Sequence, residues 1–250
     1  MSSSNKDNKE EEYQLVQVPV GGQITLEGNL STPKNAQGIV IFAHGSGSSR
    51  HSPRNKYVAQ VLQNEGIATL LIDLLTADEE EIDMRTRNLR FDIKQLAERL
   101  IGATDWWLRK EGGEEENNRN KNTDTTETQK SSFAIGYFGA STGAAAALIA
   151  AAESPNAVKA VVSRGGRPDL AGIDTLQRVQ APTLLIVGGN DVPVIDMNQR
   201  ALDKMQAVKD NKKKLVIVPG ATHLFEEPGK LEEVARLAAD WFGKYLRERT

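Results

Sequence analysis

The sequence predicts a single α/β domain with a mostly parallel eight-stranded sheet and helices on both faces. Two observations carry this prediction. Short apolar runs of strand length recur along the chain, and amphipathic segments with helical spacing separate them. This alternation is typical of a parallel sheet covered on both faces. At 250 residues, the chain is long enough for one such domain with a substantial core.

Eight strands are expected. The first two, at residues 15–20 and 23–30, are joined by Gly21-Gly22, which is a two-residue turn signal. Alternating apolar and polar residues in the second strand indicate an edge hairpin with one face in water. The remaining six strands are the apolar runs 38–43, 67–73, 133–138, 158–162, 183–187 and 215–218.

The helices between these runs have readable ends and apolar faces. Ser52 and Pro53 form a good helix start, and Gly66 is a good stop. Helical spacing of apolar residues then predicts one helix around Ile93 to Trp107 and a last one at 231–246. Their apolar positions, including Trp107 and Trp241, are expected in the core.

Two segments lack such patterns. Residues 1–12 are polar and charged, which predicts a disordered tail before a single domain at 13–250. Residues 112–129 are rich in Glu, Asn and Thr, which predicts a disordered acidic loop. This loop connects a helix to the next strand, so we expect it at the amino edge of the sheet, while ligands bind at the carboxyl edge.

Composition excludes several classes of function. The chain has no cysteine, so disulfides, thiol catalysis and cysteine metal sites are absent. Its three histidines are scattered, which argues against a metal site, and no cofactor is expected. A net charge of −3 gives no reason to expect nucleic acid as a partner. The start of the chain does not resemble a secretory signal, so a cytoplasmic protein is expected. The run of apolar and small residues at 133–152 fits a strand and a helix better than a membrane span, so no membrane is expected as a partner.

A candidate nucleophile lies at a predicted turn from strand to helix. Ser141 is the centre of Gly139-Ala140-Ser141-Thr142-Gly143, between the run 133–138 and an Ala-rich helix. Small residues suit such a sharp turn, because side chains there would collide with the neighbouring strand and helix. The alternative is a Gly-Ser turn that only connects two elements.

The acid and base follow in the second half of the chain. Asp191 follows the run 183–187 after Gly188-Gly189, and we prefer it to Asp73 and Asp169 as the catalytic acid. The alternative for each of these acids is a helix N-cap.

His223 lies beyond the last strand, where an imidazole can reach the nucleophile. His44 is better explained as a structural hydrogen-bonding group. The order Ser, Asp, His is that of the α/β-hydrolases.

With these motifs and His44-Gly45-Ser46-Gly47, the chain resembles the dienelactone-hydrolase-like group of α/β-hydrolases over residues 15–246. The resemblance implies Ser141 as nucleophile, Asp191 as acid and His223 as base. It also implies an oxyanion hole formed by the backbone N–H groups of Thr142 and Ser46. Dienelactone hydrolases proper use cysteine as nucleophile, so the serine favours a general carboxylic ester.

The sequence therefore predicts a serine hydrolase of small carboxylic esters or lactones. Only about twenty residues separate 162 from 183, which leaves no room for a helical cap and predicts an open site. A thioesterase or peptidase of the same fold, or a non-catalytic binding protein on this scaffold, is the alternative. We also hypothesise that Arg164, Arg167 or Arg50 borders the pocket and binds an anionic group of the substrate. The alternative is that these arginines are solvated or paired with nearby acids.

Overall fold

The computed structural model describes residues 13–118 and 133–247. They form an eight-stranded sheet in the order β1-β2-β4-β3-β5-β6-β7-β8. β1 and β2 pair antiparallel, as do β2 and β4, and every later pair is parallel. The strands are β1 Gln14–Gly21, β2 Ile24–Ser31, β3 Gly38–Ala43, β4 Ala68–Ile72, β5 Ala134–Ala140, β6 Val158–Arg164, β7 Thr183–Gly188 and β8 Lys213–Val218. The predicted fold class and the number of strands are confirmed.

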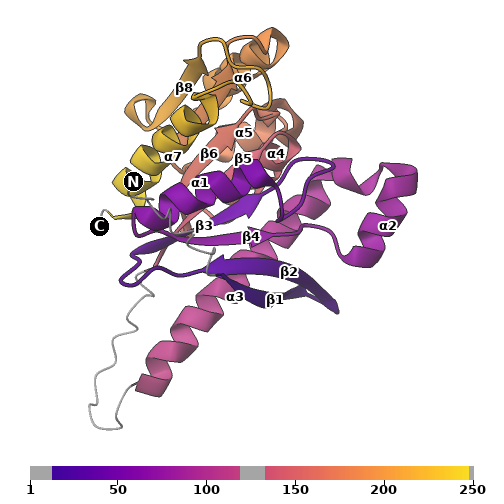
Figure 1. Cartoon of the computed structure of the whole chain (residues 1–250), viewed down its shortest axis with the longest axis vertical. Helices are drawn as coiled ribbons and strands as arrows, with labels where there is room; N and C mark the ends of the chain where they lie inside the picture. The colour runs from indigo at the N-terminus through magenta and orange to yellow at the C-terminus, as the bar shows by residue number, and fades with distance from the viewer. Residues whose placement is uncertain (1–12, 119–132, 248–250) are drawn as a thin grey trace, which may run out of the picture.

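Helices cover both faces of the sheet (Figure 1). On one face α1 and α7 pack against side chains such as Phe42, Phe138 and Ile186. On the other face α3 to α6 cover side chains such as Ile41, Tyr137 and Leu185. The helices are α1 Pro53–Asn64, α2 Ala77–Thr86, α3 Ile93–Asn118, α4 Thr142–Glu153, α5 Ile173–Arg178, α6 Val192–Lys204 and α7 Lys230–Leu246, with short 3-10 turns η1 Leu89–Phe91, η2 Pro168–Ala171 and η3 Asp210–Lys212.

The predicted ends of α1 are confirmed. The Ser52 side chain accepts a hydrogen bond from the Asn55 amide, and Pro53 is the first helical residue. Gly66 has φ of +74°, the left-handed conformation that commonly ends a helix. These ends matter for the site, because α1 begins directly after the loop that follows β3.

Two features differ from the sequence analysis. The helix α3 continues through Asn118, so residues 112–118 are helical and not part of a loop. The rest of the expected acidic loop and the expected tail at 1–12 fall outside the described residues. Helix α2 was not predicted, and Figure 1 shows it standing out from the sheet. Between β6 and β7 only η2 and α5 are inserted, and no cap domain is present there.

Candidate active site

The nucleophile candidate occupies a strained turn between β5 and α4. Ser141 has φ of 51° and ψ of −119°, a conformation that non-glycine residues rarely adopt and that is concentrated at functional sites. Its amide donates to the Arg164 carbonyl at 3.2 Å, and its carbonyl accepts from the Arg167 amide at 3.0 Å. The end of β6 and the segment after it therefore hold the turn in place, and the Ser141 side chain stays partly exposed.

The two glycines of the motif are required by close backbone contacts. A Cβ on Gly139 would lie 2.4 Å from the Ala144 Cα, and a Cβ on Gly143 would lie 2.2 Å from the Ala43 carbonyl oxygen. Any side chain at either position would push the strand, the helix or the loop after β3 apart. The sequence reasoning about small residues at this turn thus has a direct steric explanation.

The acid and base candidates are hydrogen-bonded to each other. His223 Nδ1 and Asp191 Oδ2 are 2.6 Å apart. The two loops are also joined through their backbones, because the Gly189 amide donates to the Val218 carbonyl and the Asn190 amide to the Ala221 carbonyl. The Asp191 side chain is 15% exposed and that of His223 is 38% exposed, so the imidazole stands at the surface of the cleft while its carboxylate lies deeper.

The imidazole reaches across the end of β6. A Cβ on Gly165, the residue after β6, would lie 3.4 Å from both Cε1 and Nδ1 of His223. β6 is the neighbour of β5, whose end carries Ser141. Ser141, Asp191 and His223 therefore lie at one edge of the sheet, with Nδ1 bound to Asp191. Within the described residues Ser141 and His223 make no direct hydrogen bond, and such bonds often tighten only when substrate binds.

The loop after β3 forms the other wall of the site. Gly45 lies so close to Ser141 that a Cβ on it would be 3.0 Å from the Ser141 Cβ. The Ser46 amide donates to Thr142 Oγ1 at 2.9 Å. His44 Nε2 accepts from the Leu74 amide at 3.1 Å, which explains this histidine as a structural group.

The three candidate arginines have different environments. Arg50 is paired with Asp73 and Glu27, and Arg167 forms two hydrogen bonds to Asp169, at 2.9 and 2.8 Å. The hydrogen bond to Asp169 raises the pKa of Arg167. For these two residues the structure therefore matches the pairing alternative.

Arg164 is different, because it is buried without a carboxylate partner among the described residues. It is 6% exposed, and its Nη2 lies 3.5 Å from the Asn55 Oδ1 while its Nε has no partner. Burial, together with the nearby charge of Arg54, lowers the pKa of Arg164 to about 10. Arg54 itself is paired with Glu226, which follows the catalytic histidine candidate by three positions.

A cavity of about 290 Å³ adjoins the site between the loop after β3 and the segment from α2 to α3. The buried Asp83 forms an ion pair with the partly exposed Arg90 in its wall, and Arg90 Nη1 would be 3.4 Å from a Cβ on Gly47. The sequence analysis missed this wall. The cavity is lined by His44, Gly45, Ser46, Gly47, Ser48, Ser49, Leu75, Glu80, Asp83, Met84, Arg90 and Leu96.

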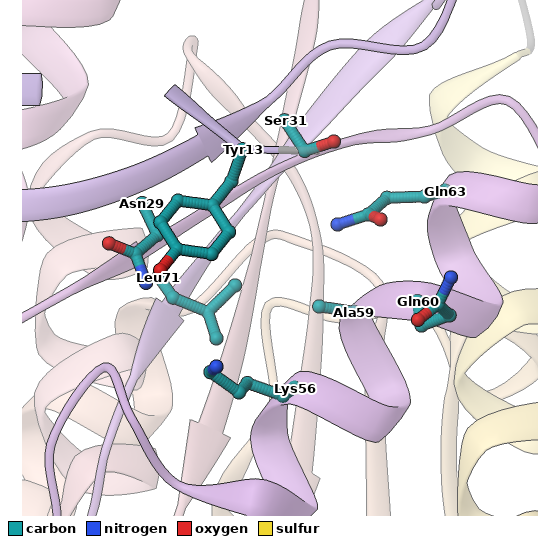
Figure 2. Close-up of a pocket in the computed structure, with 8 residues that line it drawn as sticks. All are labelled: Tyr13, Asn29, Ser31, Lys56, Ala59, Gln60, Gln63 and Leu71. Atoms are coloured by element: carbon teal, nitrogen blue, oxygen red, sulfur yellow. The ribbon is translucent and has the colours of Figure 1, made fainter. Parts of the chain in front are cut away.

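A second hollow, between β2 and α1, is too small for a substrate (Figure 2). Its volume is about 20 Å³, enough for about one water molecule. Asn29 lies in its wall, is 4% exposed, and has no partner for either side-chain polar atom. The hollow contains none of the triad candidates.

Residues 13–118 and 133–247 contain no group of three or more His, Asp or Glu side chains placed to hold a metal ion. None of their helices is both long enough and apolar enough to cross a membrane.

The sheet order, the turn at Ser141 and the hydrogen-bonded Asp191 and His223 define the α/β-hydrolase class. The model of the dienelactone hydrolase family matches residues 26–246, so the chain belongs to that family. It is similar to a dienelactone hydrolase from Anabaena variabilis, with 58% identity, a TM-score of 0.82, and coverage of 94% of this chain and 99% of that one.

More distant structures share the fold alone. An α/β serine hydrolase without a lid from Xanthomonas campestris is 18% identical with a TM-score of 0.65, and the match covers 96% of this chain and 98% of that chain.

Two curated proteins from Mycobacterium tuberculosis strains, named provisionally as phosphoribosyl transferases, are 54% identical over 238 residues. This match covers 95% of the chain but 47% of each relative, so the chain spans about half the length of the curated relatives it matches.

Proposed function

We propose that this hydrolase cleaves small carboxylic esters or lactones through an acyl-enzyme on Ser141. The observation that carries the proposal is the 2.6 Å contact of His223 Nδ1 with Asp191, beside the strained turn of Ser141. A carboxylate on Nδ1 fixes the imidazole tautomer and leaves Nε2 to act as base. The open site, without a cap between β6 and β7, favours small substrates.

The proposed reaction has two halves. Ser141 Oγ attacks the carbonyl carbon while His223 Nε2 takes its proton, and the tetrahedral intermediate collapses as His223 returns that proton to the leaving alcohol. Water, activated by the same imidazole, then attacks the acyl-enzyme and releases the acid. The Asp191 carboxylate stabilises the imidazolium that forms in each half.

The alternatives differ in the bond that is cleaved. A thioesterase or a peptidase could use the same three residues, and a binding protein could keep the fold without turnover. The transferase name of the curated relatives describes proteins about twice as long as this chain. A phosphoribosyl transferase activity is therefore not part of the proposal.

Replacing the nucleophile tests the proposal directly. Ser141→Ala should abolish ester turnover and labelling by a fluorophosphonate probe while the melting temperature stays close to that of the parent, because little packing is lost. Ser154→Ala, at the far end of α4, is the matched control and should keep both the ester turnover and the labelling by the probe. Ester turnover by Ser141→Ala near the parent level would exclude Ser141 as nucleophile. Rates on matched ester, thioester and amide substrates separate the three chemistries.

We further propose that Arg164 favours substrates with an anionic group. It is the one candidate arginine of the three that the described residues leave without a carboxylate, and a buried charge without a counter-ion is costly. Its carbonyl binds the Ser141 amide, so its backbone is in contact with the nucleophile turn. A substrate carboxylate that reached the guanidinium would supply the missing counter-ion.

The test compares an anionic and a neutral ester of the same shape. Arg164→Met should weaken kcat/KM for the anionic ester by about 1.5 to 3 kcal/mol, the range for a charge-assisted hydrogen bond, and spare the neutral one. Arg178→Met is the control, because Arg178 is exposed and paired with Glu153. Equal losses on both esters, or none on either, would contradict this role.

A further inference from the structure

The Ser46 amide, one of the two expected donors of the oxyanion hole, already has a partner in the structure. Its N–H donates to Thr142 Oγ1 at 2.9 Å. The contact joins the loop after β3 to the first residue of α4, across 96 positions of the chain. If this contact persists when substrate binds, the Ser46 N–H is directed at the threonine and not at the oxyanion.

The Thr142 hydroxyl retains the capacity to donate. A threonine hydroxyl has one proton and two acceptor positions, and the Ser46 N–H occupies one acceptor. Thr142 is 4% exposed, so water competes little for its proton. No hydrogen bond donated by this hydroxyl is found in the part of the chain that the structure describes. A hydroxyl that accepts a hydrogen bond is also polarised toward donating one.

The Thr142 hydroxyl lies next to the nucleophile turn and to the loop that forms the other wall of the site. Thr142 directly follows Ser141, and its hydroxyl contacts the loop whose Gly45 packs against the Ser141 Cβ. The Thr142 backbone N–H is in the first turn of α4, where amides have no acceptor within the helix. The Ser141 side chain does not cap that helix.

We propose that the Thr142 hydroxyl is a catalytic hydrogen-bond donor to the oxyanion, acting beside the Thr142 backbone N–H and held in position by the Ser46 N–H. This inference rests on the ester hydrolysis proposed above. As the bond from Ser141 Oγ to the carbonyl carbon forms, the serine proton passes to His223 and the π electrons of the carbonyl move to its oxygen. Thr142 donates a hydrogen bond to that oxygen and keeps its own proton. When the carbonyl forms again, the bond to the alcohol breaks and His223 protonates the alcohol.

Two substitutions separate this role from simple packing. Thr142→Val keeps the shape of the side chain and removes the hydroxyl, while Thr142→Ser keeps the hydroxyl and removes a methyl group. Thr142→Val should lower kcat for ester hydrolysis by about 100-fold, as loss of one oxyanion donor does, with KM within about twofold of the parent. Thr142→Ser should stay within about threefold. Thr25→Val, on the exposed hairpin, is the control for the substitution itself.

An inhibitor that forms a tetrahedral adduct gives a second readout. A trifluoromethyl ketone places an oxyanion in the hole, so its inhibition constant should rise with Thr142→Val by about the factor lost in kcat. A merely structural threonine would not link these two quantities. If the valine variant fails to fold, Thr142→Ala compared with Thr142→Ser supplies the same comparison.

Several outcomes would overturn the inference. Unchanged or raised kcat in Thr142→Val would show that the freed Ser46 N–H is the donor and that the hydroxyl competes with the oxyanion for it. Equal losses in the serine and valine variants would show a packing role. A parent protein that neither hydrolyses esters nor reacts with a fluorophosphonate would overturn the proposed function, and this inference with it. Normal fluorophosphonate labelling of a fully active Thr142→Val would overturn this inference alone.

Discussion

Gly143→Ala is the substitution that tests most directly how the nucleophile turn and the oxyanion loop fit together. A Cβ at residue 143 would lie 2.2 Å from the Ala43 carbonyl oxygen and 2.5 Å from that of His44. Both carbonyls belong to backbone at the end of β3, which cannot rotate away as a flexible side chain could. The added methyl group therefore has to move the loop or the start of α4.

The size of this movement sets the expected effect. Cβ contacts shorter than 3.0 Å are essentially absent from proteins, so the Ala43 oxygen and residue 143 must separate by about 0.8 Å. Overpacking of this kind costs about 1 to 3 kcal/mol of stability. A displacement near 1 Å between groups that must align for reaction costs about 100-fold in rate. We expect Gly143→Ala to lose about 100-fold in kcat/KM while remaining folded.

The assay is ester turnover at 25 °C, with thermal denaturation of the same samples. Gly243→Ala is the matched control: Gly243 is in α7, and apart from the adjoining backbone of that helix no heavy atom lies within 4 Å of a Cβ placed on it. That variant should keep full activity and gain about 0.5 to 1 kcal/mol, because alanine is the better helix former. Full activity of Gly143→Ala with an unchanged melting temperature would refute the close packing on which this reasoning depends.

Two further predictions concern charged groups. Asp191→Asn should lower kcat by about 10³ to 10⁴-fold with little change in KM, because the imidazole loses the carboxylate that fixes its tautomer; a loss below tenfold would exclude Asp191 as the acid. Burial opposes ionisation of Asp83, but hydrogen bonds and the charge of Arg90 outweigh it and hold the Asp83 pKa below its usual value. The stability contributed by the ionised Asp83 carboxylate is therefore present above about pH 4 and is lost as the pH falls through the lowered pKa. Asp83→Asn should accordingly lower the melting temperature by more at pH 7 than near pH 3. An equal difference at both pH values would contradict this account.

The central strands β3 to β7 could be predicted because they are buried on both faces and therefore appear as continuous apolar runs. The run 133–138, for example, lies in β5, of which Ile135 to Ala140 are buried. Helix α2 escaped prediction because it packs little: among its residues only Asp83 is buried, so no apolar face marks it. Its start nevertheless had a local signal, since Thr76 and Glu79 form a capping box.

The end of α3 was misplaced for a related reason. Residues 112–129 contain no leucine, valine or aromatic residue, which indicates that no core face continues there and predicts a loop. Glutamate is a good helix former, however, and the backbone of α3 continues through Asn118. A helix can extend beyond the core that it packs against, and hydrophobic periodicity detects only the packed part.

The positions of Ser141, Asp191 and His223 could be predicted because each follows a parallel strand, and the carboxyl ends of parallel strands share one edge. The hydrogen-bond and ion-pair partners of these residues' neighbours could not be predicted in this way, because they depend on which side chains the fold brings together from distant segments. Arg50 meets Glu27 from β2 and Asp73 from the end of β4. Arg164, which pairs in the sheet with Ala140 directly before Ser141, meets only the side-chain amide of Asn55. The Ser46 amide likewise follows a strand end as expected, yet its N–H donates a hydrogen bond to the Thr142 hydroxyl. Sequence order therefore determines which residues reach the cleft, and the packing between loops determines which of their donors and charges remain available for chemistry.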